Sequence, residues 1–264
     1  MYPFFEIYNG FLIYTFGLTL SVCFFIFIWM LRKLSTRFGY DFNVFRDNLL
    51  WFFIGIFFFS RLFYVFAKWD TLGYIRDPFE FFIMSDYNFS LFWAIAWFFV
   101  ILFLCLKFSK EQLLKYIDGV VLSFLFVAII GYVWTLFWGE VYGRETHIGI
   151  EILYTHPFTP VPFEVPIFPL PIVYAILTFI LFCSLYMLSL FVHIKWFIGY
   201  VGLVAFSSFI LIFESLSGKN DILKSHASFN LNQVYALLII GYVGYELYKL
   251  LQINTGSKKV TIIK

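Results

Sequence analysis

Residues Ile117–Thr146 read IDGVVLSFLFVAIIGYVWTLFWGEVYGRET, and this stretch decides the fold. From Gly119 to Trp138 it contains no charged residue. About 20 apolar residues in succession are enough for a helix to cross the hydrocarbon of a bilayer. The residues that follow combine three charged side chains with two glycines: Glu140, Arg144, Glu145, Gly139 and Gly143. The stretch therefore predicts a membrane helix with polar chemistry at its end.

The composition of the whole chain indicates a membrane protein. Of its 264 residues, 62% are hydrophobic and only 13% are charged, which is too few charges to cover a soluble domain of this length. The net charge of +2 forms no basic patch that would indicate a nucleic acid partner. The three cysteines lie in apolar runs and lack the spacing of a disulfide framework or a metal site: Cys23, Cys105 and Cys183. We expect no metal and no cofactor.

Seven apolar runs are long enough, at about 20 residues, to cross about 30 Å of hydrocarbon. Their predicted ranges are Gly10–Leu31, Leu49–Ala67, Phe89–Leu106, Gly119–Trp138, Leu170–Phe191, Trp196–Phe213 and Leu231–Leu250. We expect helices, because a helix satisfies its own backbone hydrogen bonds in lipid. The predicted fold is an all-α polytopic membrane protein, one transmembrane domain over residues 1–264 with seven transmembrane helices.

The basic residues predict the orientation of these helices. Twelve of the 18 Lys and Arg residues follow the first, third and fifth runs or lie in the C-terminal tail, whereas five lie on the opposite side. Because cytoplasmic segments carry the excess of basic residues, the N-terminus is predicted outside and the C-terminus in the cytoplasm. The motif after Trp138 then faces outward.

The longest predicted external connection is a proline-rich loop over residues 139–169, between the fourth and fifth helices. This loop and the helix start beyond it hold six of the eight prolines: Pro157, Pro160, Pro162, Pro166, Pro169 and Pro171. Proline continues neither a helix nor a strand ladder, so we expect the end of the loop to be extended and stiff. The alternating segment His147–Tyr154 before it is a candidate short strand.

Ionisable residues mark the candidate site. Arg61 lies about 12 residues into the second predicted helix, where a guanidinium is costly unless it reaches the interface or a carboxylate such as Glu140. Glu214 ends the sixth helix on the same side as Glu140 and Arg144, and we expect these groups to converge near the outer leaflet. Asp118 is predicted to cap the start of the fourth helix.

Several stretches resemble the prolipoprotein diacylglyceryl transferase family, nearly from end to end. They are Ile13–Leu20, Asp47–Phe66 with its Arg-Leu-x-Tyr-Val run, Ile117–Thr146, Phe168–Leu177 and Asn232–Ile240. The most specific is Ile117–Thr146, which fits the family's Glu-x-Tyr-Gly-Arg-x-Thr pattern without a gap. The residues that match family motif positions are Gly17, Arg61, Asp118, Gly131, Gly139, Glu140, Gly143, Arg144, Glu214 and Gln233.

Other family positions carry different residues. The first-helix tyrosine falls on Phe16, the histidine of the third helix on Ser90, and an arginine and an asparagine of the fourth helix on Tyr132 and Thr135. The glutamate of the fifth helix falls on Tyr174, and two arginines near Glu214 fall on Ile210 and Ser217. If the family pocket persists, the residues expected to line it are Phe16, Ser90, Thr135, Tyr174 and Gln233.

The resemblance implies an enzyme of the bacterial inner membrane. The family transfers a diacylglyceryl group from phosphatidylglycerol to the cysteine thiol of a prolipoprotein signal peptide. The candidate catalytic residues are Glu140, Arg144 and Glu214, and the candidate lipid-binding residues are Arg61, Tyr132, Gly139, Gly143 and Arg144. The leaving glycerol phosphate is anionic and is best held by arginine.

Two interpretations remain open. In the first, the chain is a diverged transferase that uses the remaining arginines and carboxylates, with His147 or His156 of the loop as a replacement for the family histidine. In the second, it is a catalytically inactive relative that binds membrane lipid or a lipoprotein or peptide partner, because the missing arginines and histidine would supply phosphate binding and a base. A transporter is disfavoured, because no inverted repeat is visible.

Overall fold

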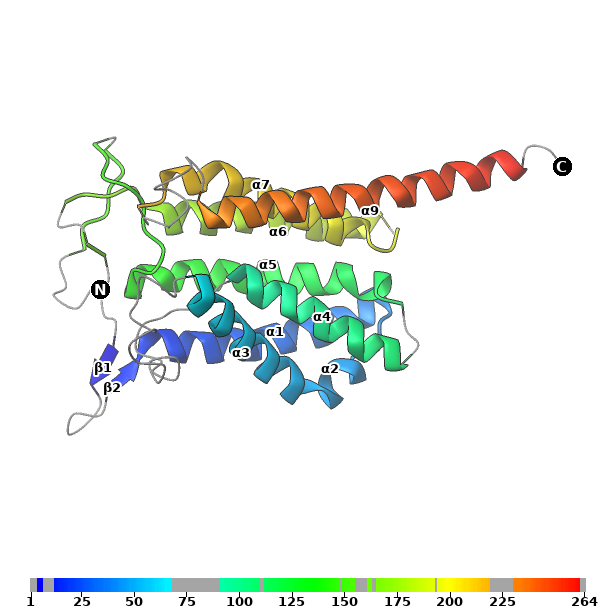
Figure 1. The fold of residues 1–264 in the computed structure, drawn as a ribbon, viewed down its shortest axis with the longest axis horizontal. Helices are drawn as coiled ribbons and strands as arrows, with labels where there is room; N and C mark the ends of the chain where they lie inside the picture. Colours follow the sequence, from blue (N-terminus) through cyan, green and yellow to red (C-terminus); the bar gives the residue numbers. More distant parts are fainter. Residues whose placement is uncertain are drawn as a thin grey trace.

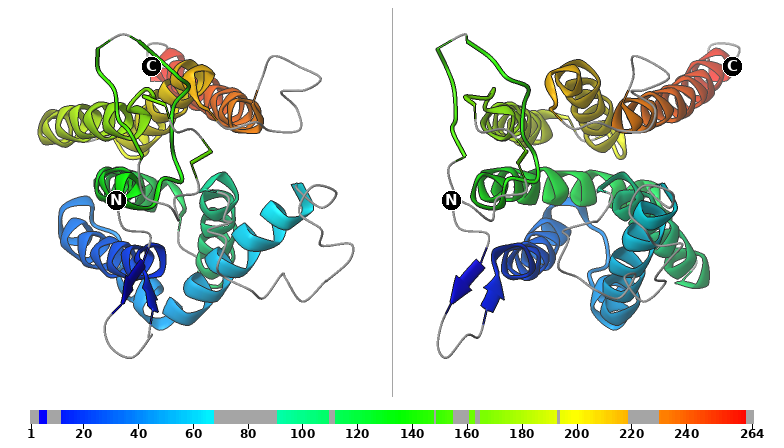
Figure 2. Two further views of the ribbon diagram at one scale, coloured as in Figure 1. Left: turned by 90° about the vertical axis from the view of Figure 1, so that its left-hand side faces the viewer. Right: turned by 60° about the vertical axis from the view of Figure 1, so that its left-hand side comes forward.

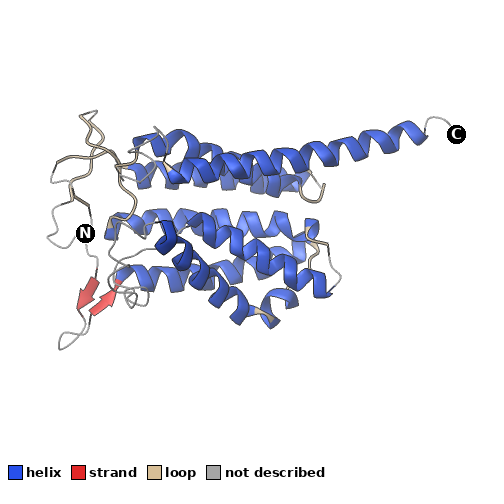
Figure 3. Ribbon diagram, viewed as in Figure 1, coloured by secondary structure: helices blue, strands red, loops and turns tan. Residues whose placement is uncertain are grey.

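The computed structural model describes residues 4–6, 12–67, 91–109, 112–147, 149–154, 161–162, 165–192, 194–218 and 230–261. The long helices of this part are α1 (Thr15–Phe38), α3 (Leu49–Ala67), α4 (Leu91–Ser109), α5 (Leu114–Trp138), α6 (Leu170–Phe191), α7 (Phe197–Phe213) and α9 (Leu231–Thr261). The short elements are the strands β1 (Phe4–Glu6) and β2 (Leu12–Tyr14), the helix α2 (Asn43–Asp47) and the 3₁₀ turn η3 (Glu214–Leu216). Helix dominates the ribbon, as Figure 3 shows.

The predicted helical membrane architecture is confirmed in its main feature. Within the described residues, six helices are long and apolar enough to cross a bilayer, which makes the chain a multi-pass membrane protein. The predicted start of the first span is wrong: residues 12–14 form strand β2, which pairs antiparallel with β1, and α1 runs on to Phe38. Apolar composition alone did not distinguish the end of this hairpin from the start of the helix.

Helix α5 is the centre of the bundle. It packs against α1 on one side and against α6 and α7 on the other, while α3 packs on α4 and α9 on α7. Figure 1 shows α1, α3, α4 and α5 in one group and α6, α7 and α9 in another, and successive long helices run in opposite directions. Figure 2 shows the same two groups from other sides. The end of α5, the turn η3 and the start of α9 therefore share one end of the bundle.

The interior of the bundle is rich in aromatic rings. Phe45, Phe52, Phe98 and Tyr116 pack where α2, α3, α4 and α5 meet, with ring centroids 5.1–6.3 Å apart. Many other large apolar side chains are exposed, among them Phe25, Trp51 and Phe108. An apolar exterior over so many helices suits contact with lipid rather than water.

The role predicted for Asp118 is wrong. Helix α5 begins at Leu114, so Asp118 already lies inside it. Its carboxylate instead accepts the backbone N–H of Trp196 at 2.8 Å and that of Gly199 at 2.7 Å. These are unpaired donors at the first turn of α7, so Asp118 caps a neighbouring helix. Helices α5 and α7 lie close together at this point, since a Cβ at Gly199 would collide with Ile117.

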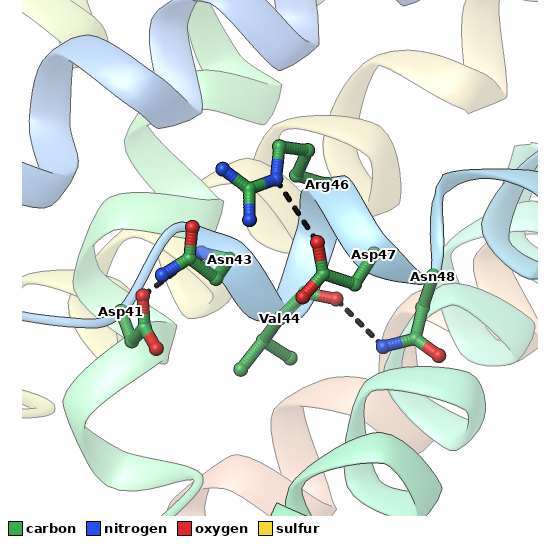
Figure 4. Close-up of polar contacts among 6 residues, drawn as sticks. All are labelled: Asp41, Asn43, Val44, Arg46, Asp47 and Asn48. Carbon is green, nitrogen blue, oxygen red and sulfur yellow. Dashed lines mark hydrogen bonds and ion pairs between the residues drawn. The ribbon is translucent and has the colours of Figure 1, made fainter.

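The connection between α1 and α3 is closed by local polar contacts, drawn in Figure 4. Asp41 Oδ1 accepts the Asn43 N–H at 2.9 Å, and Asn48 Nδ2 donates to the Val44 carbonyl at 2.9 Å. Arg46 Nε lies 2.9 Å from Asp47 Oδ1, but both side chains are exposed. Such an exposed ion pair contributes little to stability, so the amide and Asx contacts define this turn.

The segment after α5 that was a candidate strand forms a single bridge. Ile152 and Ile167 exchange two backbone hydrogen bonds of 3.0 Å. With Tyr154 and Val161 they make a small separate apolar cluster. In the described residues of this connection there is no continuous strand. The alternating pattern arises because Ile152 and Tyr154 point into this apolar cluster.

Candidate functional site

Gly139 ends α5 and turns the chain into the motif. Its φ of 76° is left-handed, and its N–H donates to the Thr135 carbonyl at 2.8 Å. A left-handed residue at the end of a helix is usually glycine, because a Cβ is unfavourable there. The half-buried Glu140 follows directly. The first glycine of the motif thus ends the helix and places Glu140 directly after its last turn.

Gly143 and Arg144 lie between two other segments of the chain. The Arg144 N–H donates to the Leu216 carbonyl at 2.9 Å, and the Phe168 N–H donates to the Arg144 carbonyl at 2.9 Å. Gly143 pairs with Ser217 as an isolated bridge. A Cβ at Gly143 would collide with the backbone oxygen of Phe168. The second glycine therefore lets the motif pass between the end of α7 and the start of α6.

The side chain of Arg144 is anchored at one nitrogen. Its Nε donates to the Ser217 carbonyl at 3.2 Å, and the residue as a whole is exposed. In the part of the chain that the structure describes, the terminal nitrogens of this guanidinium have no hydrogen-bond partner. A guanidinium held at Nε presents its remaining N–H groups as a planar fork, the geometry that suits phosphate or carboxylate.

Among the described carboxylates at this end of the bundle, Glu214 is the most buried, with 6% of its surface exposed. Tyr174 Oη donates to Oε2 at 3.0 Å, and Asn232 Nδ2 donates to Oε1 at 2.8 Å. These donors come from α6 and α9, so three elements meet at one carboxylate. A buried charge needs such partners, because burial without them costs several kcal/mol.

A second layer of hydrogen bonds joins the start of α9 to the end of α7. Asn230 Nδ2 donates to the Glu214 carbonyl at 3.2 Å, and Gln233 Nε2 donates to the Leu211 carbonyl at 2.9 Å. Gln233 Oε1 also accepts the Asn230 N–H at 3.0 Å, which is half of a capping box. Gln233 therefore braces the helix start.

Tyr132 and Thr135 of α5 complete the buried wall. The rings of Tyr132 and Tyr174 lie 5.1 Å apart at 31°. Thr135 Oγ1 donates to the Tyr132 carbonyl at 2.7 Å, and both residues are buried. The structure thus brings together Tyr132, Tyr174 and Glu214, which the sequence had placed at one site, and adds the backbone of Arg144.

The other predicted positions are less closely defined. Arg61 is buried in α3, with 4% of its surface exposed, and its pairing with Glu140 stays a prediction. Ser90 and His156 lie outside the described residues, and only the backbone of Phe16 is described. His147 is exposed, with Nε2 3.7 Å from Glu145 Oε1. Among the described residues, no group of three or more His, Cys, Asp and Glu side chains forms a metal site.

An apolar cavity of about 210 Å³ lies deeper in the bundle, between α1, α3, α4 and α5. Phe24, Phe27, Phe57, Phe98 and Phe124 are among its lining residues. None of the predicted pocket residues that the structure describes belongs to this lining. The polar site at Glu214 and this cavity are therefore separate features.

Asn230 and Asn232 were not predicted from the sequence as site residues. Both belong to the run NLNQ, Asn230–Gln233, in which three amides precede the apolar stretch Val234–Val243. Three amides at the start of a membrane helix are costly unless they find partners, and that was the available signal. Their partner, Glu214, is distant in sequence and emerged only from the fold.

Comparison with known proteins agrees with this arrangement of motifs. No curated protein matches the chain. The family description "prolipoprotein diacylglyceryl transferase" matches residues 3–247, which covers α1 to α7, the first half of α9 and every residue of the Glu214 and Arg144 site. Its members transfer a diacylglyceryl group from phosphatidylglycerol to the cysteine of a prolipoprotein. The chain belongs to the prolipoprotein diacylglyceryl transferase family.

Proposed function

We propose that this chain itself catalyses diacylglyceryl transfer and that Glu214 and Arg144 are the centre of its active site. The observation that carries the proposal is the buried Glu214 carboxylate, which lies two residues before the Leu216 carbonyl that binds the Arg144 N–H. A carboxylate and a guanidinium so placed can serve the two ends of the reaction. One accepts a proton and the other binds a phosphate.

The proposed reaction begins at the substrate thiol. Its S–H proton passes to Glu214, because the thiolate is the nucleophile. The thiolate attacks the glycerol carbon of phosphatidylglycerol that carries the phosphate ester. The C–S bond forms while the C–O bond breaks, and glycerol phosphate leaves with the electron pair. The proton on Glu214 is then released, directly or through the leaving phosphate.

Two arginines are proposed to hold the anionic head group. Arg144 supplies the fork whose Nε is already fixed on Ser217. Arg61 is proposed as the second cation, and we propose that Glu140 pairs with it. If they touch, Arg61→Ala and Glu140→Ala together will destabilise the protein less than the sum of the single variants; additive effects would contradict the pair.

The other residues of the proposed substrate pocket are taken from the family resemblance and from their burial. We propose that Tyr132, Gly139 and Gly143 border the lipid head group and that Phe16, Ser90, Thr135, Tyr174 and Gln233 surround the pocket. Phosphatidylglycerol and the prolipoprotein signal peptide are the proposed partners. We propose no cofactor and no metal: in the step above, Glu214 takes the proton and the arginines hold the phosphate.

The proposed topology has seven spans in the bacterial inner membrane, with the N-terminus outside and the C-terminus in the cytoplasm. Helix α9 is proposed as the seventh span: its 31 residues correspond to about 46 Å, more than the hydrocarbon thickness of about 30 Å. The proline-rich loop over residues 139–169 is then external. Glu214 and Arg144 share the bundle end with the start of this loop, and we therefore propose that the site lies at the outer leaflet.

Complementation in cells depleted of their own transferase tests this function. We expect the wild-type gene to restore lipoprotein maturation and Glu214→Gln to abolish it at equal protein levels. A wild-type protein that fails to rescue, yet binds phosphatidylglycerol vesicles, would establish the alternative of an inactive lipid-binding relative.

A further inference from the structure

The donors to Glu214 lie outside the motif that carries the family resemblance most strongly. Tyr174 is in the first turns of α6 and Asn232 in the first turn of α9. Each donates to a different oxygen of the same carboxylate, at 3.0 and 2.8 Å. The two bonds come from two different helices and reach different oxygens, so together they restrict both the position and the rotation of the carboxylate.

The geometry leaves Glu214 able to accept a proton. A carboxylate has about four acceptor positions, two on each oxygen. Tyr174 and Asn232 occupy one on each oxygen. One position on each oxygen therefore remains for a third donor, such as a substrate thiol.

The two donors are themselves held rigidly. The ring of Tyr174 packs on Tyr132, 5.1 Å away. Asn232 is fixed because Gln233 caps the Asn230 N–H and Asn230 binds the Glu214 carbonyl. A donor that cannot move holds its acceptor at low entropic cost, which is the requirement for a preorganised site. The titratable groups that interact with the Glu214 carboxylate among the described residues are Tyr174 and Tyr132, while Arg144 contacts the chain two and three residues further on, at Leu216 and Ser217.

We propose that Tyr174 and Asn232 are positioning residues that hold the Glu214 carboxylate ready to take the proton of the substrate thiol. The proposal rests on the proposed function of Glu214. Tyr174 borders the proposed pocket with its ring, but the positioning role belongs to its hydroxyl, which is engaged with Glu214. Loss of that hydroxyl or of the Asn232 amide should therefore reduce the rate of the proton-transfer step and leave substrate binding intact.

The test uses the purified full chain in detergent or nanodiscs, with phosphatidylglycerol and a lipobox peptide. We expect Tyr174→Phe and Asn232→Ala each to lower kcat about 10- to 100-fold, with KM for both substrates unchanged. Asn48→Ala and Tyr154→Phe serve as matched controls at near wild-type kcat. Asn48 Nδ2 binds only a local carbonyl, and Tyr154 lies in the separate cluster after α5.

A pH profile separates positioning from a structural role. A cysteine thiol ionises by itself near pH 8.5. If the two residues act through proton transfer, the kcat deficit of Asn232→Ala will shrink about tenfold or more between pH 7 and pH 9.5. A deficit that is constant with pH, or a loss of folded protein without a change in kcat, would overturn the positioning role.

The outcomes also distinguish this inference from the proposed function. An active wild type with an inactive Glu214→Gln and unaffected Tyr174→Phe and Asn232→Ala would reject the positioning role only. A fully active Glu214→Gln, or a wild type without transfer, would reject both proposals. Asn232→Ser, which keeps a shorter donor, should recover part of the kcat lost in Asn232→Ala.

Discussion

The Asp118 carboxylate of α5 accepts the Gly199 N–H of α7 at 2.7 Å and so caps a helix that begins some 80 residues later in the chain. This contact lies at the opposite end of the bundle from Glu214. It fixes α7 at its first turn, while the start of α9 holds α7 at its last turn. Helix α7, which delivers Glu214, is therefore fastened at both ends.

Removal of this cap should lower stability more than removal of an exposed one. Asp118→Ala leaves two N–H groups of the α7 start without a partner, and we expect a loss of about 2 kcal/mol or more. Asp41→Ala is the matched control, because Asp41 accepts a single exposed N–H, and it should cost about 0.5–1 kcal/mol. Thermal unfolding in detergent measures both. Equal losses would contradict the role of Asp118.

Gly143 and Gly131 should respond oppositely to alanine. A methyl group at Gly143 meets the Phe168 carbonyl, so Gly143→Ala is expected to destabilise by about 1–3 kcal/mol and to reduce transfer by displacing Arg144. Gly131 lies inside α5 with open space around its Cα. Gly131→Ala should be neutral or stabilising by up to about 1 kcal/mol. Thermal unfolding and transfer rates check the pair, and a tolerated Gly143→Ala would show that the segment can shift.

The buried Tyr154 should make the outer connection sensitive to alkali. Burial raises the pKa of Tyr154 to about 12, from an ordinary value of 10. Below pH 10 the phenol is neutral in both states, so its full contribution to stability is present. Between pH 10 and about 12 only the unfolded state ionises, so stability falls as pH rises.

Tyr154→Phe should remove this part of the alkaline loss. Its hydroxyl has no hydrogen-bond partner among the described residues, so the variant should match or exceed wild-type stability at pH 7, by up to about 1 kcal/mol. Unfolding midpoints at pH 7, 10 and 11.5 provide the measurement. A variant that is much less stable at pH 7 would reveal a partner for the hydroxyl.

Cysteine labelling tests the topology. In a background with Cys23, Cys105 and Cys183 replaced by alanine, we expect Glu151→Cys to react with a membrane-impermeant maleimide in intact spheroplasts. Lys195→Cys should react only after permeabilisation. Both positions are exposed. The reverse pattern would invert the orientation derived from the basic residues.

The sequence predicted the main features of the bundle because apolar run length is a direct physical requirement of a bilayer. The runs Leu49–Ala67 and Leu170–Phe191 coincide with α3 and α6, residue for residue. It failed at the first span, where strand β2 is as apolar as the helix that follows it. Length and hydropathy do not separate a short hairpin from a helix start.

The candidate site was predictable only in part. Gly139, Gly143 and Arg144 could be found from the spacing of the family motif, although only Gly139, which ends α5, has a role that is local in the chain. Asn232 could not be assigned a role, because its partner Glu214 is distant in sequence. The role of Asp118 was predicted wrongly for the same reason, since it caps α7 and not its own helix. Side-chain pairs between helices depend on packing that no single run of residues encodes.

The most direct test of the account is transfer by the purified protein, followed as the mass gained by a lipobox peptide incubated with phosphatidylglycerol. The account predicts one diacylglyceryl group added at the peptide cysteine by the wild type, a loss of at least about 100-fold in kcat for Glu214→Gln, and an increased KM for phosphatidylglycerol in Arg144→Ala. Full activity of Glu214→Gln, or no mass gain with the wild type, would contradict it.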